Sequence, residues 1–538
     1  MTESARERSG ERSWLEVAVG AAAVVAVTAM LLASLYVLKP EQFAFSGFLF
    51  QDQGVNLYLA DRLLDGEMLY RDVASQYGPV PAYGYALFAW IFGNSVETYF
   101  LWLALGSTVT MLLAYLAMVR FASAATSVVV TLFVVLPWAL VPGSNVAGFT
   151  SNAYIPVEQI CLLLVVLAWT PPTRRSLRRA AAMGALLGLW QSVKFGGAIF
   201  FVPAILLADV IYLAAAHRGE AVRELRGLAV RTAVMLGVLP AVEAVRVGAL
   251  YAAMPAEVAF DAAWPAYLVE AYDTLPQFMY MRNSWRYFVD RAQLGAIPIL
   301  LALAGLVWSV SRASRSDEGR RDLAGCLTLS LGLFFYAFAS LRYFAHVPLF
   351  LQYFWCALFG GALFLDRLRL PFRVVIALLL TPGIFYVAKN VYWTPRDAQV
   401  EGYRTPSGDV LYLHAGEVRR VEAIRRAIPA GESGPLPVLF VARDLTGSGF
   451  ATLFDLPAPL RTHWFIRGFV RPYEERELLE FLRGPHALVL ICTQAPCELP
   501  CGQLEGVVAP ELCAEIDRLV AEDEVIEADG GVRVFVRK

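Results

Sequence analysis

An aspartate stands where the first long apolar segment of the chain ends. Asp52 follows the apolar sequence "FSGFLFQ" and opens the acidic stretch "DQGVNLYLADRLLDGEMLYRDVASQYGP". An ionised carboxylate at membrane depth costs about 3 kcal/mol unless water or a cation reaches it. Asp52 is therefore expected either to face a wet cavity or to cap the N-terminus of a helix that begins at Gln53. The residue type and its position leave both interpretations open.

Two further ionisable residues lie at the ends of apolar runs. Glu158 is the only acid in the polar break "VPGSNVAGFTSNAYIPVEQ", and it lies slightly inside the run that follows. An ionisable residue at that depth is a functional hypothesis by default, with a hydrogen-bonded glutamate of a helix bundle as the alternative. Lys194 lies in "QSVKFGG" between two apolar runs. Its ammonium can bind a phosphate as a point charge, or it can simply extend to the membrane interface.

The overall composition is that of a membrane protein with several spans. Of the 538 residues, 58% are hydrophobic and 17% are charged, and the mean hydropathy is +0.54. Soluble domains are nearer to 45–50% apolar and about 25% charged. The net charge is −2, and no basic stripe with interleaved aromatic residues is present. The electrostatic footprint of a nucleic-acid-binding protein is missing, so no nucleic-acid partner is expected.

Apolar runs of about 20 residues, separated by polar breaks, predict about eleven transmembrane helices. The first run follows a basic N-terminus and is too long for the core of a signal peptide. It is expected to remain as an anchor with its N-terminus in the cytoplasm. The expected spans are residues 15–38, 96–119, 122–141, 153–170, 179–194, 196–215, 228–252, 292–311, 323–341, 345–365 and 372–391.

Arginine clusters set the expected orientation, because positively charged breaks stay in the cytoplasm. With the N-terminus inside, "TPPTRRSLRRA", "HRGEAVRELRGLAVR" and "SRASRSDEGRRD" all fall on the cytoplasmic side. The first outer loop is then 39–95, and the chain from about residue 393 lies outside. A transmembrane domain of residues 1–392 and an extracytoplasmic domain of residues 393–538 are therefore predicted, in the cytoplasmic (inner) membrane.

The C-terminal part alternates short strand-type runs with amphipathic helices. "LPVLFVARD" and "HALVLICTQ" favour strands, whereas "VRRVEAIRRAI" and "EERELLEFLRG" have helical periodicity. A small α/β domain is predicted. Four cysteines there indicate two disulfides with three possible pairings. A zinc site is the alternative, although the spacing matches no common zinc module; the residues are Cys492, Cys497, Cys501 and Cys513.

The first outer loop is expected to hold two helices at the membrane surface. Apolar residues recur at helical spacing over residues 53–64, and Gly66 then offers a stop. A second apolar segment, "PVPAYGYALFAWIFG", begins at prolines and ends at Gly93. Its length of about 15 residues is short for a span but suits an interfacial helix. Asp61 and Asp65 are expected on the solvated face of the first helix.

This loop resembles the first outer loop of GT-C glycosyltransferases that use polyprenyl-phosphate sugars. The shared pattern is an acidic residue after the first span, a surface helix, "GEMLYRD", and a proline that opens a second surface helix ending in "FGNS". In this respect the loop resembles that of the bacterial family similar to lipopolysaccharide-core galacturonosyltransferases. Protein O-mannosyltransferases and lipid A aminoarabinose transferases are more distant. The motifs occupy about residues 45–95, and the resemblance in layout, which implies a polytopic α-helical GT-C fold, covers about 15–390.

The resemblance implies an inverting transfer of a sugar from a polyprenyl-phosphate donor to an extracytoplasmic hydroxyl on a glycan, a lipid or a protein. Asp52 then corresponds to the catalytic base, which takes the acceptor's proton as the new bond forms. Asp72 either acts on the acceptor or orients the loop, or it only pairs with Arg71 or caps a turn. Glu158 is a further candidate acid, and the leaving phosphate needs cations where charge develops. The candidate substrate-binding residues are Lys194, Arg342, His346, Tyr70, Asn152 and Tyr154.

No metal or cofactor is expected from the sequence. The first outer loop holds no histidine, and its carboxylates lack the spacing of a calcium loop. No glycine-rich phosphate-binding loop follows a strand, which disfavours a nucleotide-sugar donor. Two other functions stay open. One is a transporter or flippase of polyprenyl-linked sugars, for which repeated halves would be expected but are not visible. The other is a non-catalytic membrane anchor for the C-terminal domain. Membrane lipids are expected partners throughout.

Overall fold

The computed structural model describes the N-terminal half of the chain and most of its last 140 residues. The expected spans from residue 292 onward lie outside the described residues, as do Asn152, Arg342 and His346. The described residues are 14–38, 52–132 without 76 and 121, 154–169, 176–194, isolated positions between 198 and 213, 221–264, and, with short gaps, 400–428, 436–441, 446–462, 470–491 and 508–537, together with 500 and 504.

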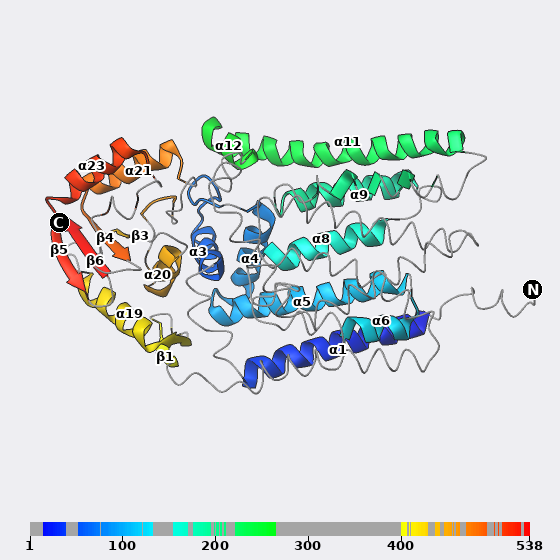
Figure 1. Cartoon of the computed structure of the whole chain (residues 1–538), viewed down its shortest axis with the longest axis horizontal. Helices are drawn as coiled ribbons and strands as arrows, with labels where there is room; N and C mark the ends of the chain where they lie inside the picture. The colour runs from blue at the N-terminus through cyan, green and yellow to red at the C-terminus, as the bar shows by residue number, and fades with distance from the viewer. Residues whose placement is uncertain are drawn as a thin grey trace, which may run out of the picture.

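Six helices of the described part run side by side and form a bundle (Figure 1). Three segments are long and apolar enough to cross a membrane, namely Trp14–Ser34, Val96–Val119 and Leu225–Ala253, and Pro156–Ala168 is a shorter apolar helix. They fall within or close to expected spans, as a helical membrane protein requires, whereas the expected number of about eleven spans stays a prediction. The bundle helices are α1 (Trp14–Leu38), α5 (Val96–Val119), α6 (Ala124–Val130), α8 (Tyr154–Ala168), α9 (Leu177–Gln191) and α11 (Ala221–Ala253).

Helices α9 and α11 pack closely because small residues of α9 face α11. A Cβ atom at Gly184 would lie 2.4 Å from the carbonyl oxygen of Met235, and one at Gly188 would lie 2.8 Å from Cβ of Val242. Small residues at such positions let the backbones of membrane helices approach each other. The contact holds α9, whose last turn leads to Lys194, against α11.

Two short helices of the first loop lie across the bundle axis at one of its ends (Figure 1). Helices α3 (Asp52–Leu64) and α4 (Pro79–Phe92) have the bounds expected for the surface helices to within a residue. Gly66 and Gly93 follow them with φ of 89° and 86°, in the left-handed region that favours glycine. Both helices therefore end where the sequence offers a stop, and α4 begins at a proline, which suits a first helical turn.

Asn94 joins α3 to α4 through its side-chain amide. Its Nδ2 donates to the Leu57 carbonyl (3.0 Å) and to Asp61 Oδ1 (2.6 Å), and its Oδ1 accepts a hydrogen bond from the Tyr85 hydroxyl (2.7 Å). The expectation that Asp61 is only solvated is therefore wrong, whereas Asp65 is exposed as expected. Helical periodicity predicts which residues lie on the polar face of a helix. It does not distinguish a solvated carboxylate from one that accepts a hydrogen bond from a residue distant in the sequence.

The C-terminal residues form a four-stranded sheet with helices on both faces. The strand order is β3–β4–β6–β5, in which β3 is parallel to β4, and β6 is antiparallel to β4 and β5. Alternate residues from Ala487 to Ile491 share a core with α19, whereas Leu488 and Leu490 share one with α21 and α23. This alternation is that of a strand buried on both faces. The elements are β3 (Val438–Val441), β4 (His486–Ile491), β5 (Glu524–Ala528), β6 (Val532–Arg537), α19 (Ala415–Ala427), α21 (Pro472–Arg483) and α23 (Pro510–Val520).

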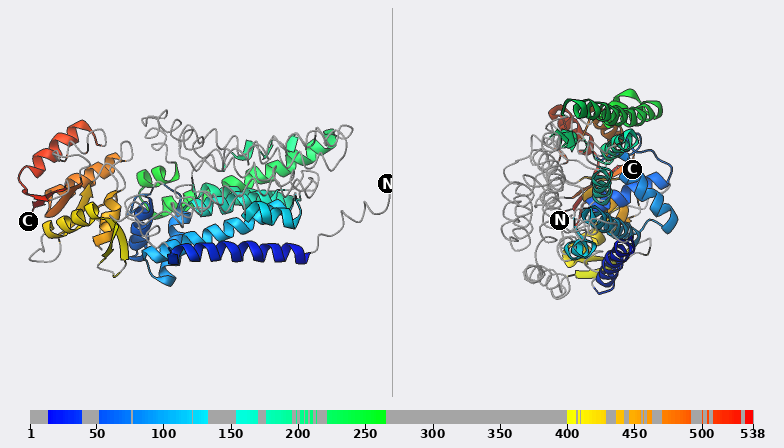
Figure 2. Two further views of the ribbon diagram at one scale, coloured as in Figure 1. Left: turned by 60° about the horizontal axis from the view of Figure 1, so that its bottom comes forward. Right: turned by 90° about the vertical axis from the view of Figure 1, so that its right-hand side faces the viewer.

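The C-terminal region, residues 400–537, lies at the end of the bundle where α3 and α4 cross it (Figures 1 and 2). It also contains the antiparallel hairpin of β1 (Val400–Arg404) and β2 (Val410–His414) and the helix α20 (Thr446–Phe454), which packs against α3. Helix α1 begins at the opposite end of the bundle. The start of α1 and the C-terminal region therefore lie at opposite ends of the bundle, while the cytoplasmic side and the domain boundary at 392/393 stay predictions.

Cys513 of α23 is disulfide-bonded. This agrees with the predicted disulfides and disfavours the zinc alternative, because zinc binds the free thiolate. The partner of Cys513 lies outside the described residues, as do Cys492, Cys497 and Cys501. In the described part of the chain Cys161 is buried and free, and no group of His, Cys, Asp and Glu side chains could hold a metal ion.

Replacing Asn94 by alanine should destabilise the pairing of α3 with α4, because it removes all three hydrogen bonds of the amide. The expected loss in the free energy of unfolding is about 1–3 kcal/mol, the cost of leaving partly buried polar groups unsatisfied. The apparent melting temperature of the purified protein measures it. Asp65→Ala, at an exposed carboxylate of the same loop, is the matched control and should melt like the wild type. An Asn94→Ala protein that also melts like the wild type would contradict this role.

Candidate functional site

The residues between α3 and α4 form a tight turn around Tyr70. Its φ is 69°, a left-handed conformation that is uncommon for a bulky residue and costs about 1 kcal/mol or more. The Tyr70 NH donates to the Val73 carbonyl (2.7 Å), and the hydroxyl donates to the Tyr77 carbonyl (2.5 Å). The strained residue therefore holds both ends of the turn.

Asp72 stabilises this turn from within. Its carboxylate pairs with the Arg71 guanidinium (2.7 Å) and accepts a hydrogen bond from the Met68 NH (2.8 Å). The hydrogen bond with Arg71, helped by that from Met68 and opposed by burial, holds the pKa of Asp72 below its usual value. Both local contacts that the sequence offered as the alternative are present, and a role of Asp72 in catalysis stays a prediction.

Arg62 supports the turn from helix α3. It is 8% exposed, pairs with Glu67, and donates to the Tyr58 hydroxyl (3.2 Å) and to the Asp72 carbonyl (3.3 Å). Burial raises the pKa of Tyr58, so its hydroxyl stays protonated at neutral pH. The sequence does not single out Arg62, because an arginine among aspartates on an amphipathic helix has the pattern of a solvated residue.

Tyr77 connects the turn to the bundle. Its ring stacks on that of Tyr154 at the start of α8, with 4.3 Å between centroids. Lys194 Nζ lies 4.8 Å from the centroid of the same Tyr154 ring and donates to its hydroxyl (3.4 Å). An ammonium is attracted to an aromatic face, which holds Lys194 at this place. Three expected substrate-binding residues, Tyr70, Tyr154 and Lys194, are thus joined through Tyr77, which the sequence analysis did not single out.

Glu158 lies one turn further along α8 and is 2% exposed. Its carboxylate accepts a hydrogen bond from Trp190 Nε1 of α9 (3.3 Å), and the Trp190 carbonyl accepts one from the Lys194 NH (3.1 Å). The contact with Trp190 is that of a hydrogen-bonded glutamate within the bundle. Because the Lys194 NH also bonds to Trp190, Glu158 and Lys194 are both connected to the last turn of α9. A catalytic role of Glu158 stays a prediction.

Asp52 is the first residue of α3. The following residues of the helix, from Val55 to Ala60, are buried at the end of the bundle. The side chain of Asp52 lies outside the part of the chain that the structure describes. Its two interpretations, facing a wet cavity and capping the helix, therefore both stay predictions.

The turn is attached to the end of α9 through the backbone. The Gly78 NH donates to the Val193 carbonyl (3.1 Å), and the Val80 NH donates to the Ser192 carbonyl (3.3 Å). A Cβ atom on Gly78 would lie only 1.9 Å from the Ser192 carbonyl oxygen, so the approach requires glycine. Lys194 directly follows Val193, so its position depends on how the loop packs against the end of α9.

An ion pair of α11 supports the same place. The Ser192 hydroxyl donates to Glu243 (3.3 Å), and Glu243 pairs with Arg246 (2.7 Å). Arg246 also donates to the carbonyls of Ala262 (3.4 Å) and Ala263 (3.1 Å) at the C-terminal end of α12 (Ala256–Ala263), where the helix dipole favours a cation. This pair was not among the expected site residues, although two ionisable residues three apart inside an expected span are a functional signal in the sequence.

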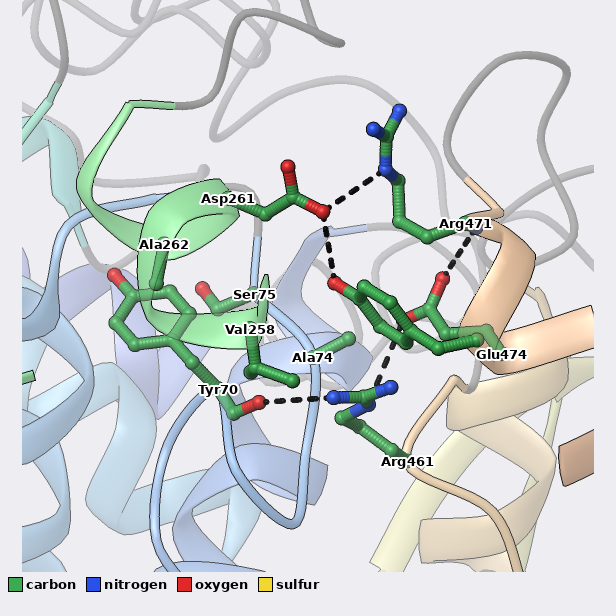
Figure 3. Close-up of a pocket in the computed structure, with 10 residues that line it drawn as sticks. Tyr70, Ala74, Ser75, Val258, Asp261, Ala262, Arg461, Arg471 and Glu474 are labelled. Carbon is green, nitrogen blue, oxygen red and sulfur yellow. Dashed lines mark hydrogen bonds and ion pairs between the residues drawn. The ribbon is translucent and has the colours of Figure 1, made fainter. Parts of the chain in front are cut away.

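A cavity of about 30 Å³ lies between α12, the turn and the C-terminal region (Figure 3). Asp261 of α12 accepts hydrogen bonds from Arg471 Nε and from the Tyr473 hydroxyl, both at 3.1 Å. On the opposite wall Arg461 donates to the Tyr70 carbonyl (3.5 Å). The space can hold water. The residues that line it form a polar interface between α12, the turn and the C-terminal region.

No family model matches the chain, and no curated protein matches it. Solved structures do. ArnT from Cupriavidus metallidurans bound to undecaprenyl phosphate matches over 96% of this chain and 97% of its own, with a TM-score of 0.51 and 13% identity. The archaeal oligosaccharyltransferase AglB from Archaeoglobus fulgidus, in complex with an inhibitory peptide and a dolichol-phosphate, matches over 88% of this chain and 69% of its own, with a TM-score of 0.50 and 14% identity. Both are GT-C fold glycosyltransferases.

The chain has the GT-C fold. The fold that the first-loop motif implied is thereby confirmed, and at 13% and 14% identity the likeness is one of fold alone. Within this GT-C fold the turn around Tyr70, the start of α8 and the residues after α9 meet at the end of the bundle that faces the C-terminal region (Figure 1).

Replacing Gly78 by alanine should detach the turn from α9, because the new Cβ collides with backbone atoms that cannot rotate away. Two backbone hydrogen bonds, each worth about 0.5–1.5 kcal/mol, would be lost, and amide hydrogen exchange at Gly78 and Val80 should rise about tenfold or more. Exchange mass spectrometry of the purified protein measures this. Gly237→Ala, at a glycine of α11 with nothing within 4 Å of the new Cβ, is the control. Unchanged exchange in Gly78→Ala would disprove the proposed requirement for glycine.

Proposed function

We propose that the protein is an integral membrane glycosyltransferase that moves a sugar, with inversion, from a polyprenyl-phosphate donor to an acceptor hydroxyl outside the cytoplasm. The observation that carries the proposal is the meeting of the Tyr70 turn, Tyr154 and Lys194 at one end of a GT-C bundle. The same loop begins with the candidate base, Asp52. The proposed reaction needs a base for the acceptor hydroxyl and a cation for the donor phosphate close together in one site.

Lys194 is the proposed partner of the donor phosphate. Its ammonium is held by the face and hydroxyl of Tyr154 at the start of α8. A lysine acts on phosphate as a compact point charge, and charge that develops on the leaving phosphate during transfer is stabilised by a pre-positioned cation. Arg342 and His346, in the last outer turn, and Tyr70 are proposed to complete the donor site.

Asp52 is the proposed catalytic base. A carboxylate close to the acceptor hydroxyl takes its proton as the oxygen attacks the anomeric carbon, which typically contributes about 10²–10⁴-fold to the rate. Glu158 and Asp72 are proposed to act on the acceptor side, with Asn152 and Tyr154 nearby. The contacts of Asp72 with Arg71 and Met68 support an effect on the acceptor through the shape of the turn.

The donor class rests on the neighbours in fold. ArnT is bound to undecaprenyl phosphate, and AglB is in complex with a dolichol-phosphate. We propose a polyprenyl-phosphate-linked sugar as the donor, with a glycan, lipid or protein acceptor of the cell envelope, and a role in polysaccharide biosynthesis. The proposed layout has about eleven spans in the cytoplasmic (inner) membrane. An α/β domain of residues 393–538 would lie outside, with the N-terminus in the cytoplasm and membrane lipids as partners.

Asp52→Asn should abolish sugar transfer, because the amide cannot take the proton of the acceptor. The expected loss is about 10²–10⁴-fold. Membranes with equal amounts of wild type, Asp52→Asn and the control Asp65→Asn are incubated with radiolabelled polyprenyl-phosphate sugars and native membrane acceptors. Asp65 is an exposed carboxylate of the same loop, so its variant should retain transfer. Equal transfer by all three proteins would reject Asp52 as the base, and no transfer by wild type from any donor would favour the transporter or anchor functions.

Lys194→Met should weaken donor binding, because it removes the proposed charge partner of the phosphate and keeps most of the side-chain length. A hydrogen bond to a charged group is worth about 1.5–3 kcal/mol, so the KM for the donor should rise roughly 10- to 150-fold. Arg178→Met removes one charge from the other end of α9, at an exposed position, and should leave this KM unchanged. A Lys194→Met enzyme with the wild-type donor KM would contradict the assignment.

A further inference from the structure

Arg461 of the C-terminal region contacts the first loop directly. It is 7% exposed. Its carbonyl accepts a hydrogen bond from the Ala74 NH (3.0 Å), and its Nη1 donates to the Tyr70 carbonyl (3.5 Å). One residue of the C-terminal region therefore bonds the turn at two points, and one of these is the residue with the strained backbone.

The guanidinium of Arg461 is held firmly on its own side of the interface. Nη2 donates to Glu477 (3.1 Å), Nε lies 3.7 Å from Glu474, and the group lies 4.1 Å from the centroid of the Tyr473 ring. A buried arginine with two carboxylates and an aromatic face has its position determined by several contacts at once. It is suited to hold another segment in place.

The turn transmits this contact to the proposed donor site. The Tyr70 hydroxyl donates to the Tyr77 carbonyl, the Tyr77 ring stacks on Tyr154, and Tyr154 carries Lys194 on its face. Each step is a direct contact, so the path from Arg461 to Lys194 is continuous. Displacement of Tyr70 would change the place of Tyr77 and thereby the surface on which Lys194 rests.

A second contact joins the same two parts without involving the turn. Arg471 and Tyr473 both donate to Asp261 of α12 (Figure 3). Arg471 thus attaches the C-terminal region to the bundle as Arg461 does, but it does so through α12. This difference supplies a matched control, because the same substitution at Arg471 weakens the interface without removing a bond to Tyr70.

We propose that Arg461 is a positioning residue of the candidate active site. Through Tyr70 and Tyr77 it keeps Tyr154 and Lys194 in the arrangement that binds the donor phosphate, which makes the C-terminal region part of the site rather than a cover over it. The consequence for donor binding rests on the proposed function, whereas the effect on the turn does not depend on it.

The first test is amide hydrogen exchange of the purified full-length protein in detergent. Arg461→Gln should raise exchange in the peptides that cover residues 69–78 by about tenfold, and Arg471→Gln should leave it unchanged there while raising it in α12. Unchanged exchange of 69–78 in Arg461→Gln would overturn the proposal. An equal rise in both variants would also overturn it, because the turn would then respond only to general loosening of the interface.

The second test uses donor kinetics to separate positioning from folding. Arg461→Gln should raise the KM for a radiolabelled polyprenyl-phosphate sugar about tenfold, with Arg471→Gln like the wild type. In a Lys194→Met background the Arg461 substitution should add nothing, because the residue through which it acts is gone. If the two substitutions raise the donor KM additively in the double variant, the path through Lys194 would be overturned. A substitution that only destabilised the protein would instead lower the apparent kcat, because less active enzyme would be present.

If Arg461→Gln does not accumulate, Arg461→Lys keeps a charge beside Glu474 and Glu477 but lacks the second arm that reaches Tyr70, and it should show the same rise in exchange. If the wild type transfers no sugar, the proposed function fails while the exchange experiment still decides whether Arg461 holds the turn.

Discussion

Two backbone hydrogen bonds, from Gly78 and Val80 to the carbonyls of Val193 and Ser192, fasten the first loop to the end of α9. Backbone groups buried at the end of an apolar bundle must find partners, since an unpaired one is costly. The carbonyls of Ser192 and Val193, which directly follow α9, and the amides of the loop satisfy each other. Once this contact is made, Tyr77 can stack on Tyr154, and the lysine that follows α9 lies at the surface that the loop completes.

Charged residues around this contact link different elements to one another. The pair of Glu243 and Arg246 links the end of α9 to α12, and Asp261 of α12 receives Arg471 from the C-terminal region. Breaking a buried pair by removing one partner is strongly unfavourable, because it leaves an uncompensated charge. These contacts give the end of the bundle a defined geometry, which the proposed donor-phosphate site would require.

Local features of the structure followed well from the sequence. The bounds of α5 are those of the apolar run at 96–119, and α4 ends at Gly93, the glycine that closes its apolar segment. Run length and a stop signal act within one element, so the residues concerned are neighbours in the chain. The expectation for Asp61 was wrong for the opposite reason, since its partner Asn94 lies 33 residues away. Arg62 has the pattern of a solvated residue, and its bond to the Asp72 carbonyl reaches ten residues along the chain. Glu243 and Arg246 are neighbours on α11, but their links to Ser192 and to α12 depend on how the elements pack.

The sequence by itself determined that the bundle is built from apolar helices, that its first loop folds into two short helices, and that this loop has the motif of the GT-C fold. These are properties of segments, set by hydropathy, periodicity and turn residues. Only the tertiary structure decided that Tyr77 lies between Tyr70 and Tyr154, and that Arg461 reaches a carbonyl 391 residues earlier. Such contacts arise from the way whole elements pack, because the energy that favours them is realised only when distant surfaces meet.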